Sequence, residues 1–486
     1  MSKAANHAEN EALDIIIIGA GISGLAAAHQ VQKSLPHHSY AILEGRNAIG
    51  GTWDLFRFPG VRSDTDLVTF GFSWYPWTAN EIIAKGELIR DYLEEAAASE
   101  GIDRHVRFGH KVKRAEWDSG ESRWRVSVDV EGEKAIQLAS RMIVFAAGYY
   151  DYDSGLAADV PGLQNFDGDV IHPQFWPKDL DLSGRRIALI GSGATAITLL
   201  PSLAKEAEHV TMVQRSPTYI MSLPNAITGK WLYRFLPSWL AFQIQRIPYL
   251  LGPLFLYLHC KWFPNTAKKS IQDAATAQLP KGYPVEKHFQ PRYEPWDQRV
   301  CFCPDGDFYR AIRDGGASVV TDTIQKVSSK GVTMSGGDRI DCDMIVTATG
   351  LKMRIAGGVE VVVDGEPVQL SQKTLWRSTL IQDVPNCAFL LGYKHMSWTI
   401  GAELNASLFC RILRYMDRRG LHAVVPRQTR LSELIPFIAL KSSYVLRGMD
   451  DMLKTGDSGP WKGRASYFVD KLKAQYSSIT NGLVYS

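Results

Sequence analysis

Two glycine-rich segments hold the residues whose type and spacing could bind a phosphate-containing cofactor. Residues 19–24 read GAGISG and follow the β-branched run 15–18, and residues 191–196 read GSGATA and follow the apolar run 187–190. A tight loop between a strand and a helix lets the backbone approach a pyrophosphate, which then faces the positive end of that helix. The sequence therefore predicts two dinucleotide-binding units, 172 residues apart.

The residue that ends the next strand distinguishes the two units. Glu44 stands twenty residues after Gly24, where a carboxylate suits a free ribose 2′-hydroxyl and favours FAD or NAD over NADP. Arg215 stands nineteen residues after Ala196, where a guanidinium can clamp a 2′-phosphate with two parallel hydrogen bonds. One acidic and one basic unit in a single chain predict a flavoprotein, with FAD in the first unit and NADPH in the second.

The elements that must position these loops indicate an α/β fold. Apolar period and β-branched content predict a helix at 86–101 and strands at 14–18, 40–43, 112–117, 124–130, 143–145, 187–190, 210–213 and 343–346. The strands that end at 145 and 346 lead into AAG and TATG, where larger side chains would collide with a cofactor or the crossing chain. We predict two Rossmann-like domains: an FAD-binding domain (1–160 and 370–486) and an NADP-binding domain (161–225 and 291–369) that carries a helical insertion (226–290).

Composition excludes several other classes of protein. The chain has 486 residues, 45% of them apolar, and 54 basic against 51 acidic residues, which argues against intrinsic disorder, a multi-span membrane protein and a nucleic-acid binder. The six cysteines are scattered without a CxxC pair, which disfavours a disulfide framework, a metal site and a dithiol reductase. The first residues show no secretory signal pattern, so we expect a cytoplasmic protein. No feature predicts the oligomeric state.

The most apolar tract is the thirteen-residue segment 247–259, which is too short to cross a hydrocarbon layer of about 30 Å. The more economical interpretation is a buried helical insert. Peripheral contact with a membrane is the alternative.

Two further motifs specify the chemistry. The first is Phe166-x-Gly168-x-x-x-His172-x-x-x-Trp176-Pro177, and the second is the tract 50–64, GGTWDLFRFPGVRSD. At these motifs the chain resembles the type I Baeyer–Villiger monooxygenases, and almost end to end it resembles their ethionamide-activating subgroup. The resemblance implies that Phe166, Gly168, His172 and Trp176 belong to a linker that acts in domain rearrangement, so His172 is not expected to be a general base.

The resemblance also implies which residues act in catalysis and cofactor binding. Arg299 would stabilise negative charge on a flavin peroxide, and Asp64 would fix its guanidinium. Many family members have Lys where this chain has Gln298, which leaves Arg215 more of the 2′-phosphate recognition. The residues carried over to FAD are Gly19, Gly21, Ile22, Ser23, Gly24, Glu44, Gly51, Thr52, Trp53, Asp64 and Val112. Those carried over to NADP are Arg62, Ser63, again Asp64, Gly191, Ser192, Gly193, Ala194, Thr195, Ala196, Ile197, Arg215 and Ser216.

The function implied by the resemblance is oxidation of a small apolar ketone by O₂ and NADPH to an ester or lactone. An S- or N-oxygenating flavin monooxygenase is the nearest alternative, and a flavin-binding redox sensor is one from another class. We expect the insertion (226–279) and the loop at Met396-Ser397-Trp398 to shape the substrate pocket.

Overall fold

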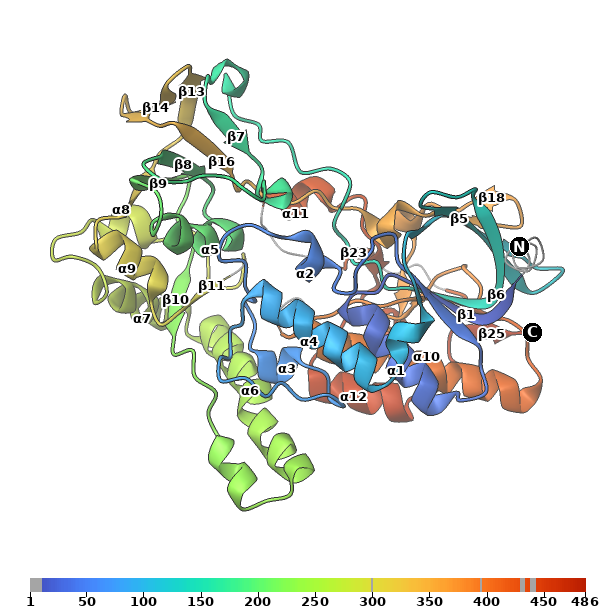
Figure 1. Ribbon diagram of the computed structural model, residues 1–486. Coiled ribbons are helices and arrows are strands. Elements are labelled where there is room, and N and C mark those ends of the chain that lie inside the picture. The colour runs from blue at the N-terminus through green and yellow to red at the C-terminus, as the bar shows by residue number, and fades with distance from the viewer. Residues whose placement is uncertain (1–10, 299, 394–395, 429–432, 438–442) are drawn as a thin grey trace.

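Two β-sheets lie at opposite ends of the molecule, each with its own helices (Figure 1). The computed structural model describes residues 11–486 apart from 299, 394–395, 429–432 and 438–442. The chain starts in the first sheet, crosses to the second after β6 (Ile136–Phe145) and returns after β16 (Met344–Thr347).

The first sheet is built around β1 (Ala12–Ile18), which pairs in parallel with β6 on one side and β2 on the other. Ile15, Ile16 and Ile17 are fully buried, because both faces of this central strand are covered. The strand order is β18-β17-β4-β5-β6-β1-β2-β3, with β21 also on β6 and β19 and β20 extending from it. The other strands span Tyr40–Leu43 (β2), Val106–Arg107 (β3), His110–Asp118 (β4), Arg123–Val130 (β5), Glu360–Val363 (β17), Glu366–Pro367 (β18), Leu375–Trp376 (β19), Leu380–Ile381 (β20) and Cys387–Phe389 (β21).

The second sheet is entirely parallel, in the order β12-β9-β8-β16-β7. Its strands β8 and β9 carry the second glycine-rich loop and Arg215 at their carboxyl ends. Besides β16, the strands of this sheet span Asp169–Ile171 (β7), Arg186–Ile190 (β8), His209–Gln214 (β9) and Ala317–Thr321 (β12). Smaller sheets of this half contain Ile220–Leu223 (β10), Cys301–Pro304 (β11), Ile324–Ser328 (β13), Gly331–Met334 (β14) and Arg339–Asp341 (β15).

Helices cover the sheets in two groups. In the first group, α1 (Ile22–Ser34) packs on the first sheet, and α10 (Trp398–Arg419) packs along α1. The other helices of this group are α2 (Thr52–Leu55), α3 (Leu67–Phe70), α4 (Gly86–Ser99) and α12 (Tyr467–Tyr476). The second group lies beside the other sheet and comprises α5 (Ala194–Leu203), α7 (Pro264–Thr276), α8 (Val285–Phe289) and α9 (Asp307–Arg313). The last elements are β22 (Val424–Pro426), β23 (Ile435–Pro436), α11 (Ser443–Gly448), β24 (Lys454–Thr455) and β25 (Leu483–Tyr485).

The return crossing differs from the predicted domain boundary at residue 369. Strand β17 pairs in parallel with β4, so it already extends the first sheet. The crossing therefore lies between Thr347 and Glu360. Without β17, β4 would have no hydrogen-bonded neighbour on that side and would be the edge of the sheet. The composition of residues 360–363 does not indicate which of the two sheets they join.

The insertion is helical, as predicted, but its expected burial is wrong on one face. It contains the 3₁₀ turn η5 (Lys230–Arg234) and α6 (Ser238–Trp262), a 25-residue helix that includes the apolar tract 247–259. In this tract Ile247 is 50% exposed and Phe255 is 63% exposed. The turn and the start of α6 project from the body of the molecule (Figure 1).

Among the described residues, no helix has both the length and the apolar character that crossing a bilayer requires.

Candidate active site

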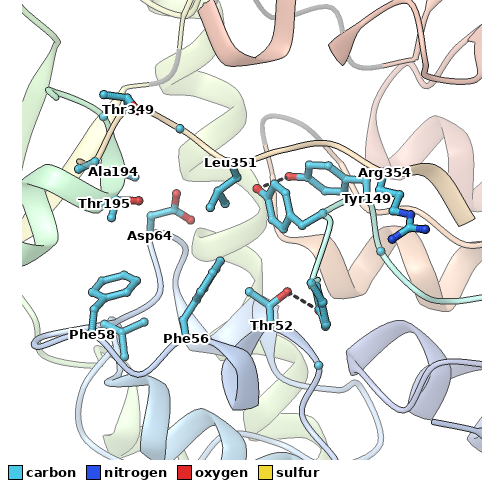
Figure 2. Close-up of a pocket in the computed structure, with 18 of the residues that line it drawn as sticks. Thr52, Phe56, Phe58, Asp64, Tyr149, Ala194, Thr195, Thr349, Leu351 and Arg354 are labelled. Atoms are coloured by element: carbon cyan, nitrogen blue, oxygen red, sulfur yellow. Dashed lines mark hydrogen bonds between the residues drawn. The ribbon is translucent and has the colours of Figure 1, made fainter. Parts of the chain in front are cut away.

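A cavity of about 1060 Å³ lies between the two sheets and is lined by both glycine-rich loops. Gly19, Gly21 and Glu44 line it from the first sheet, and Gly191 and Arg215 line it from the second. Because the carboxyl ends of parallel strands in both units open onto the same space, two ligands bound there would meet. Figure 2 shows side chains of both units directed into this space.

The first loop has the geometry that its glycines predict. Gly19 has φ +106°, a conformation that favours glycine, and a Cβ on it would lie 3.0 Å from the carbonyl oxygen of Ala146. A Cβ on Gly24 would lie only 1.9 Å from the carbonyl oxygen of Gly19, so helix and loop are in direct backbone contact. Gly21 is the N-cap of α1 and has no side-chain cap, which leaves the first N–H groups of the helix for an anion.

The second loop repeats this geometry. Gly191 has φ +135°, and a Cβ on it would lie 2.2 Å from the carbonyl oxygen of Ala348. Gly193 is the uncapped N-cap of α5 with φ −83° and ψ −175°, against −82° and −174° for Gly21. In both units the glycine-rich loop thus lies in close contact with the small residues that follow a late strand, Ala146 in the first and Ala348 in the second.

Glu44 is 7% exposed and lines the cavity directly after β2. One carboxylate oxygen accepts the Ala20 amide at 2.7 Å and the other accepts the Arg46 amide at 2.9 Å. Burial raises the pKa of Glu44, and these two amides and the Arg46 charge oppose that shift. Since each carboxylate oxygen has two acceptor sites, one on each oxygen is left for hydroxyl donors.

Arg215 directly follows β9, is exposed and lines the cavity. Nearby, the Ser192 hydroxyl donates to the Ser216 carbonyl oxygen at 3.2 Å and accepts from Thr218 at 3.1 Å. No ion pair joins Arg215 to an acid within the described part of the chain. Its guanidinium is therefore available to a phosphate group.

Asp64 lies between the two units. Its carboxylate points into the cavity, beside Thr195 on one side and Leu351 on the other (Figure 2). The side chain is half-buried, and the Thr65 hydroxyl approaches one carboxylate oxygen at 3.4 Å. Arg299, the partner expected from the sequence, lies outside the described residues, so their pairing stays a prediction. Gln298 lines the cavity.

Two residues carried over to NADP have other contacts in this structure. The Arg62 guanidinium makes a two-pronged ion pair with Asp307 at the start of α9, and it also borders the cavity. The Ser63 hydroxyl accepts the Ala84 amide at 3.3 Å and is buried away from the cavity. The Arg62–Asp307 pair joins the loop after α2 to the start of α9, across 245 residues of sequence.

The structure brings most of the predicted binding residues together and places a few elsewhere. The predicted residues that line the cavity are Gly19, Gly21, Ile22, Ser23, Glu44, Gly51, Thr52, Trp53, Arg62, Asp64, Val112, Gly191, Ser192, Gly193, Ala194, Thr195, Arg215 and Ser216. Those that do not are Gly24, Ser63, Ala196 and Ile197. Gly24 and the buried Ala196 and Ile197 support the loops from behind by packing helix against strand.

Along the sequence, the fingerprint tract (166–177) lies between β6 of the first sheet and β8 of the second. Its residues 169–171 form β7, the edge strand on β16, and a Cβ on Gly168 would lie 2.4 Å from the Asp343 carbonyl oxygen. His172 caps the 3₁₀ turn η4 (Pro173–Phe175) by accepting the Gln174 amide on Nδ1 at 3.2 Å. Burial lowers the pKa of His172. Neither His172 nor Trp176 lines the cavity, which agrees with a linker role.

Tyr149, which sequence reasoning missed, forms part of the cavity wall together with Trp398 of the predicted loop. Tyr149 stacks on Trp398 with ring centroids 5.3 Å apart, and the indole N–H of Trp398 donates to the Ser23 hydroxyl at 2.8 Å. Tyr149 follows directly after the AAG end of β6. Its position at the carboxyl end of a parallel strand was the signal that could have identified it.

The predicted loop borders this cavity and the insertion does not, so their expected parts in the substrate pocket stay predictions. Met396 and Trp398 line the cavity. Among the described residues, none between Thr218 and Tyr293 does. The insertion instead points away from the space between the sheets (Figure 1).

The two crossing segments are tied together beside the cavity by ion pairs. Asp151, on the outgoing segment, contacts Lys352 at 3.0 Å and Arg354 at 3.4 Å on the returning one. Burial would raise the pKa of Asp151, but hydrogen bonds from Lys352, Ser154 and the Asp153 amide outweigh it and lower the pKa to about 2. At neutral pH these ion pairs join the segment that leaves the first sheet to the segment that returns to it.

The residues present fit a flavin dinucleotide in the first unit. The uncapped α1 terminus suits its pyrophosphate, and the buried Glu44 carboxylate suits its ribose hydroxyls. Gly51 has φ +56°, and a Cβ on it would lie 3.1 Å from the Gly21 Cα. The two loops therefore meet here through their backbones alone. Trp53 supplies a flat wall at the other end.

Known proteins of similar sequence match nearly the whole length of the chain. A family model described as pyridine nucleotide-disulphide oxidoreductase matches residues 13–235. The FAD-containing monooxygenase EthA of Mycobacterium tuberculosis (strain ATCC 25618 / H37Rv) is 44% identical over 464 residues, which cover 95% of this chain and 94% of that protein. EthA of Mycolicibacterium smegmatis is 42% identical over 473 residues, with 96% of each covered. The probable FAD-binding monooxygenase AlmA of Acinetobacter baylyi is 39% identical over 477 residues, with 97% and 96% covered.

Solved structures share the fold. The open crystal structure of cyclohexanone monooxygenase superposes with a TM-score of 0.75 at 20% identity, covering 98% of this chain and 100% of that one. An oxidised steroid monooxygenase bound to NADP gives 0.74 at 21% identity, covering 98% and 99%. The predicted α/β fold with two dinucleotide-binding domains is therefore confirmed.

Proposed function

This chain belongs to the FAD-containing monooxygenases, and from that premise we propose that it is an NADPH-dependent Baeyer–Villiger monooxygenase that converts apolar ketones to esters or lactones. In the balanced reaction, ketone, O₂, NADPH and a proton give ester, water and NADP⁺. One oxygen atom enters the ester between the carbonyl carbon and the migrating carbon, and the other leaves as water.

The observation that supports the proposal best is the single cavity lined by both glycine-rich loops, with the Asp64 carboxylate between them. FAD bound in the first unit supplies the two-electron chemistry that connects the nicotinamide to O₂. The chain's own residues bind and orient: Glu44 takes ribose hydroxyls of FAD, and Arg215 takes the 2′-phosphate that distinguishes NADPH from NADH.

Asp64 and Arg299 carry the proposed specificity for ketones. A guanidinium preorganised beside the reacting carbon stabilises the negative charge that develops on the ketone's carbonyl oxygen. In this proposal Asp64 orients that guanidinium. The aromatic wall of Tyr149, Trp398 and Trp53 narrows the access of water to this part of the cavity.

Product analysis tests the proposal. Purified protein with FAD, NADPH and ¹⁸O₂ is given a cyclic ketone and a thioether in parallel, and products are identified by mass spectrometry. A lactone that carries one ¹⁸O is expected. Sulfoxide without lactone would overturn the proposal in favour of heteroatom oxygenation, and NADPH consumption that yields only hydrogen peroxide would favour a redox sensor.

A variant pair tests the role of Asp64. Asp64→Ala is expected to lower the rate of lactone formation per bound FAD by up to about 10²–10³, the usual loss when a preorganised donor is lost, because the guanidinium that Asp64 holds is no longer fixed. Asp159→Asn is the matched control, because Asp159 is an exposed carboxylate on the same cavity. Equal losses in both variants would remove Asp64 from the mechanism.

A further inference from the structure

The insertion presents exposed aromatic and aliphatic side chains at η5, along α6 and directly after each of them, which we name the insertion surface. Large apolar side chains on this segment are 37–76% exposed, although such residues are normally buried. The insertion surface consists of Trp231, Tyr233, Phe235, Trp239, Ile244, Ile247, Phe255, Trp262 and Phe263.

From residue 244 to the end of α6 the exposed apolar residues keep to one side of the helix, while Trp239, in the first turn, lies outside that side. Ile244, Ile247, Phe255 and Trp262 follow one another at steps of three, eight and seven residues, which places them within one stripe of a helix with 3.6 residues per turn. The half-buried Leu251 fills the gap in this stripe. The helix therefore has an apolar face that the rest of the chain leaves exposed.

The opposite side of α6 is packed on the protein. Gln245, Arg246 and Leu250 are buried, and the Arg246 guanidinium lies 5.5 Å from the centre of the Phe242 ring. Helix α6 also contacts α3 of the FAD-side domain. Only one face is therefore free to meet a partner.

Hydrogen bonds fix the tip of the insertion. The Thr228 amide donates to the Tyr249 hydroxyl at 2.9 Å, and the Gln245 amide side chain donates to the Thr228 carbonyl oxygen at 2.8 Å. The Tyr233 hydroxyl donates to Gln245 at 3.0 Å. These contacts hold η5 against α6, so Trp231 and Phe235 are displayed by a structured turn.

The charge of the segment is of one sign. No Asp or Glu occurs between His209 and Gln272, whereas six Lys or Arg residues occur between 226 and 272. Arg246 is buried, and Lys261 and Lys268 pair with Asp297 and Glu294 outside the segment. Arg234 at the tip and Lys269 on α7 are exposed. Positive side chains thus flank the apolar face without negative ones among them.

We propose that the insertion surface docks this protein on an anionic lipid bilayer, with α6 lying in the plane of the interface. Trp and Tyr side chains favour the boundary between acyl chains and headgroups, and Lys and Arg next to them are attracted to anionic headgroups. A helix with one apolar face and the other face packed on protein can enter such a boundary only to the depth of its side chains.

A second copy of the chain would be the other occupant of such a surface. In a two-fold dimer the same patch would face itself, which would bring Arg234 and its neighbouring cations from both copies together. The one-sided charge therefore favours the lipid.

Vesicle flotation tests the proposal with the full-length FAD-loaded protein. Vesicles of phosphatidylcholine with phosphatidylglycerol, and vesicles of phosphatidylcholine alone, are compared at low and high salt. We expect the protein to float with the anionic vesicles, and the bound fraction to fall at least fivefold in high salt or without phosphatidylglycerol. Equal binding to neutral vesicles would overturn the electrostatic part of the proposal, and no binding to either would overturn all of it.

A pair of triple variants locates the contact. Trp231→Ser/Phe235→Ser/Trp239→Ser is expected to reduce the vesicle-bound fraction at least tenfold. The matched control, Leu472→Ser/Tyr476→Ser/Val484→Ser, removes apolar side chains that are 59%, 77% and 55% exposed elsewhere, and it should bind like the unchanged protein. Flavin content and oligomeric mass are measured for every variant. A dimer that only the first triple variant dissociates, without vesicle binding, would overturn the proposal in favour of self-association.

Discussion

Gly24→Ala offers a sharp test of how the first loop holds its cofactor. A Cβ at this position would lie 1.9 Å from the carbonyl oxygen of Gly19, more than 1 Å closer than the 3.0 Å below which real Cβ atoms essentially never approach. The loop cannot yield easily, because the Gly19 amide donates to the Leu43 carbonyl oxygen at 2.8 Å. Helix α1 cannot retreat either, since it packs along α10.

The size of the effect follows from this overlap. Overpacking of a close contact typically costs about 1–3 kcal/mol. Because the strain falls on the loop that faces the pyrophosphate, and about 1.4 kcal/mol is tenfold in affinity, FAD affinity should fall by about 10- to 100-fold. The second loop has the buried Ala196 at the equivalent position, so the penalty belongs to the packing of the first unit and not to the motif.

The assay is the flavin-to-protein ratio after gel filtration, followed by FAD titration of the apoprotein. Thermal unfolding with and without excess FAD gives a second readout, because a bound ligand stabilises the folded protein by an amount that grows with the logarithm of its affinity. Gly252→Ala is the control: a Cβ there meets nothing within 4 Å, and alanine is favoured in a helix interior by about 0.5–1 kcal/mol. If Gly24→Ala bound FAD as tightly as the Gly252→Ala control, the packing argument would be refuted.

Three more predictions follow from the contacts of the site. Arg215→Ala should raise the KM for NADPH at least tenfold while changing that for NADH little, and an equal rise for both in steady-state kinetics would refute the phosphate assignment. Arg62→Met should lower stability by about 1–3 kcal/mol in denaturant unfolding, because it leaves the partly buried Asp307 carboxylate without its ion-pair partner. The double variant with Asp307→Leu should recover part of that loss, and no recovery would contradict a paired interaction. Burial raises the pKa of Asp66 to about 6, so the folded protein binds this proton more tightly than the unfolded chain. Folding therefore favours the protonated form, and the free energy of unfolding falls as pH rises from about 4 to 6. We expect Asp66→Asn to have a higher melting temperature than the unchanged protein at pH 7. At pH 4 the two melting temperatures should be similar. A melting-temperature difference that is the same at both pH values would contradict this.

Local patterns in the sequence were sufficient for the elements and for the two loops. The strand at 40–43 and the helix at 86–101 were predicted close to their observed bounds, Tyr40–Leu43 and Gly86–Ser99. The equivalence of Gly21 and Gly193, which have nearly the same backbone angles, could also be predicted, because a tight turn before a helix depends only on neighbouring residues.

Residues that act through distant contacts could not be assigned in this way. Arg62 was expected at the nicotinamide nucleotide because of its place in the tract 50–64, but its guanidinium pairs with Asp307, 245 residues away. Tyr149 and Trp398 meet across the first domain to form one wall of the cavity. Neither residue has a local pattern that specifies the other.

The sequence by itself determined the type of each unit: an acidic and a basic dinucleotide loop, each set by a few adjacent residues whose backbone requirements are local. Only the tertiary structure decided that both loops open onto one cavity and that the insertion stays out of it. The same applies to the apolar tract 247–259, whose residues are apolar on most sides of the helix. Which of those sides is buried depends on what the rest of the chain packs against it, and that cannot be read from the period of the helix alone.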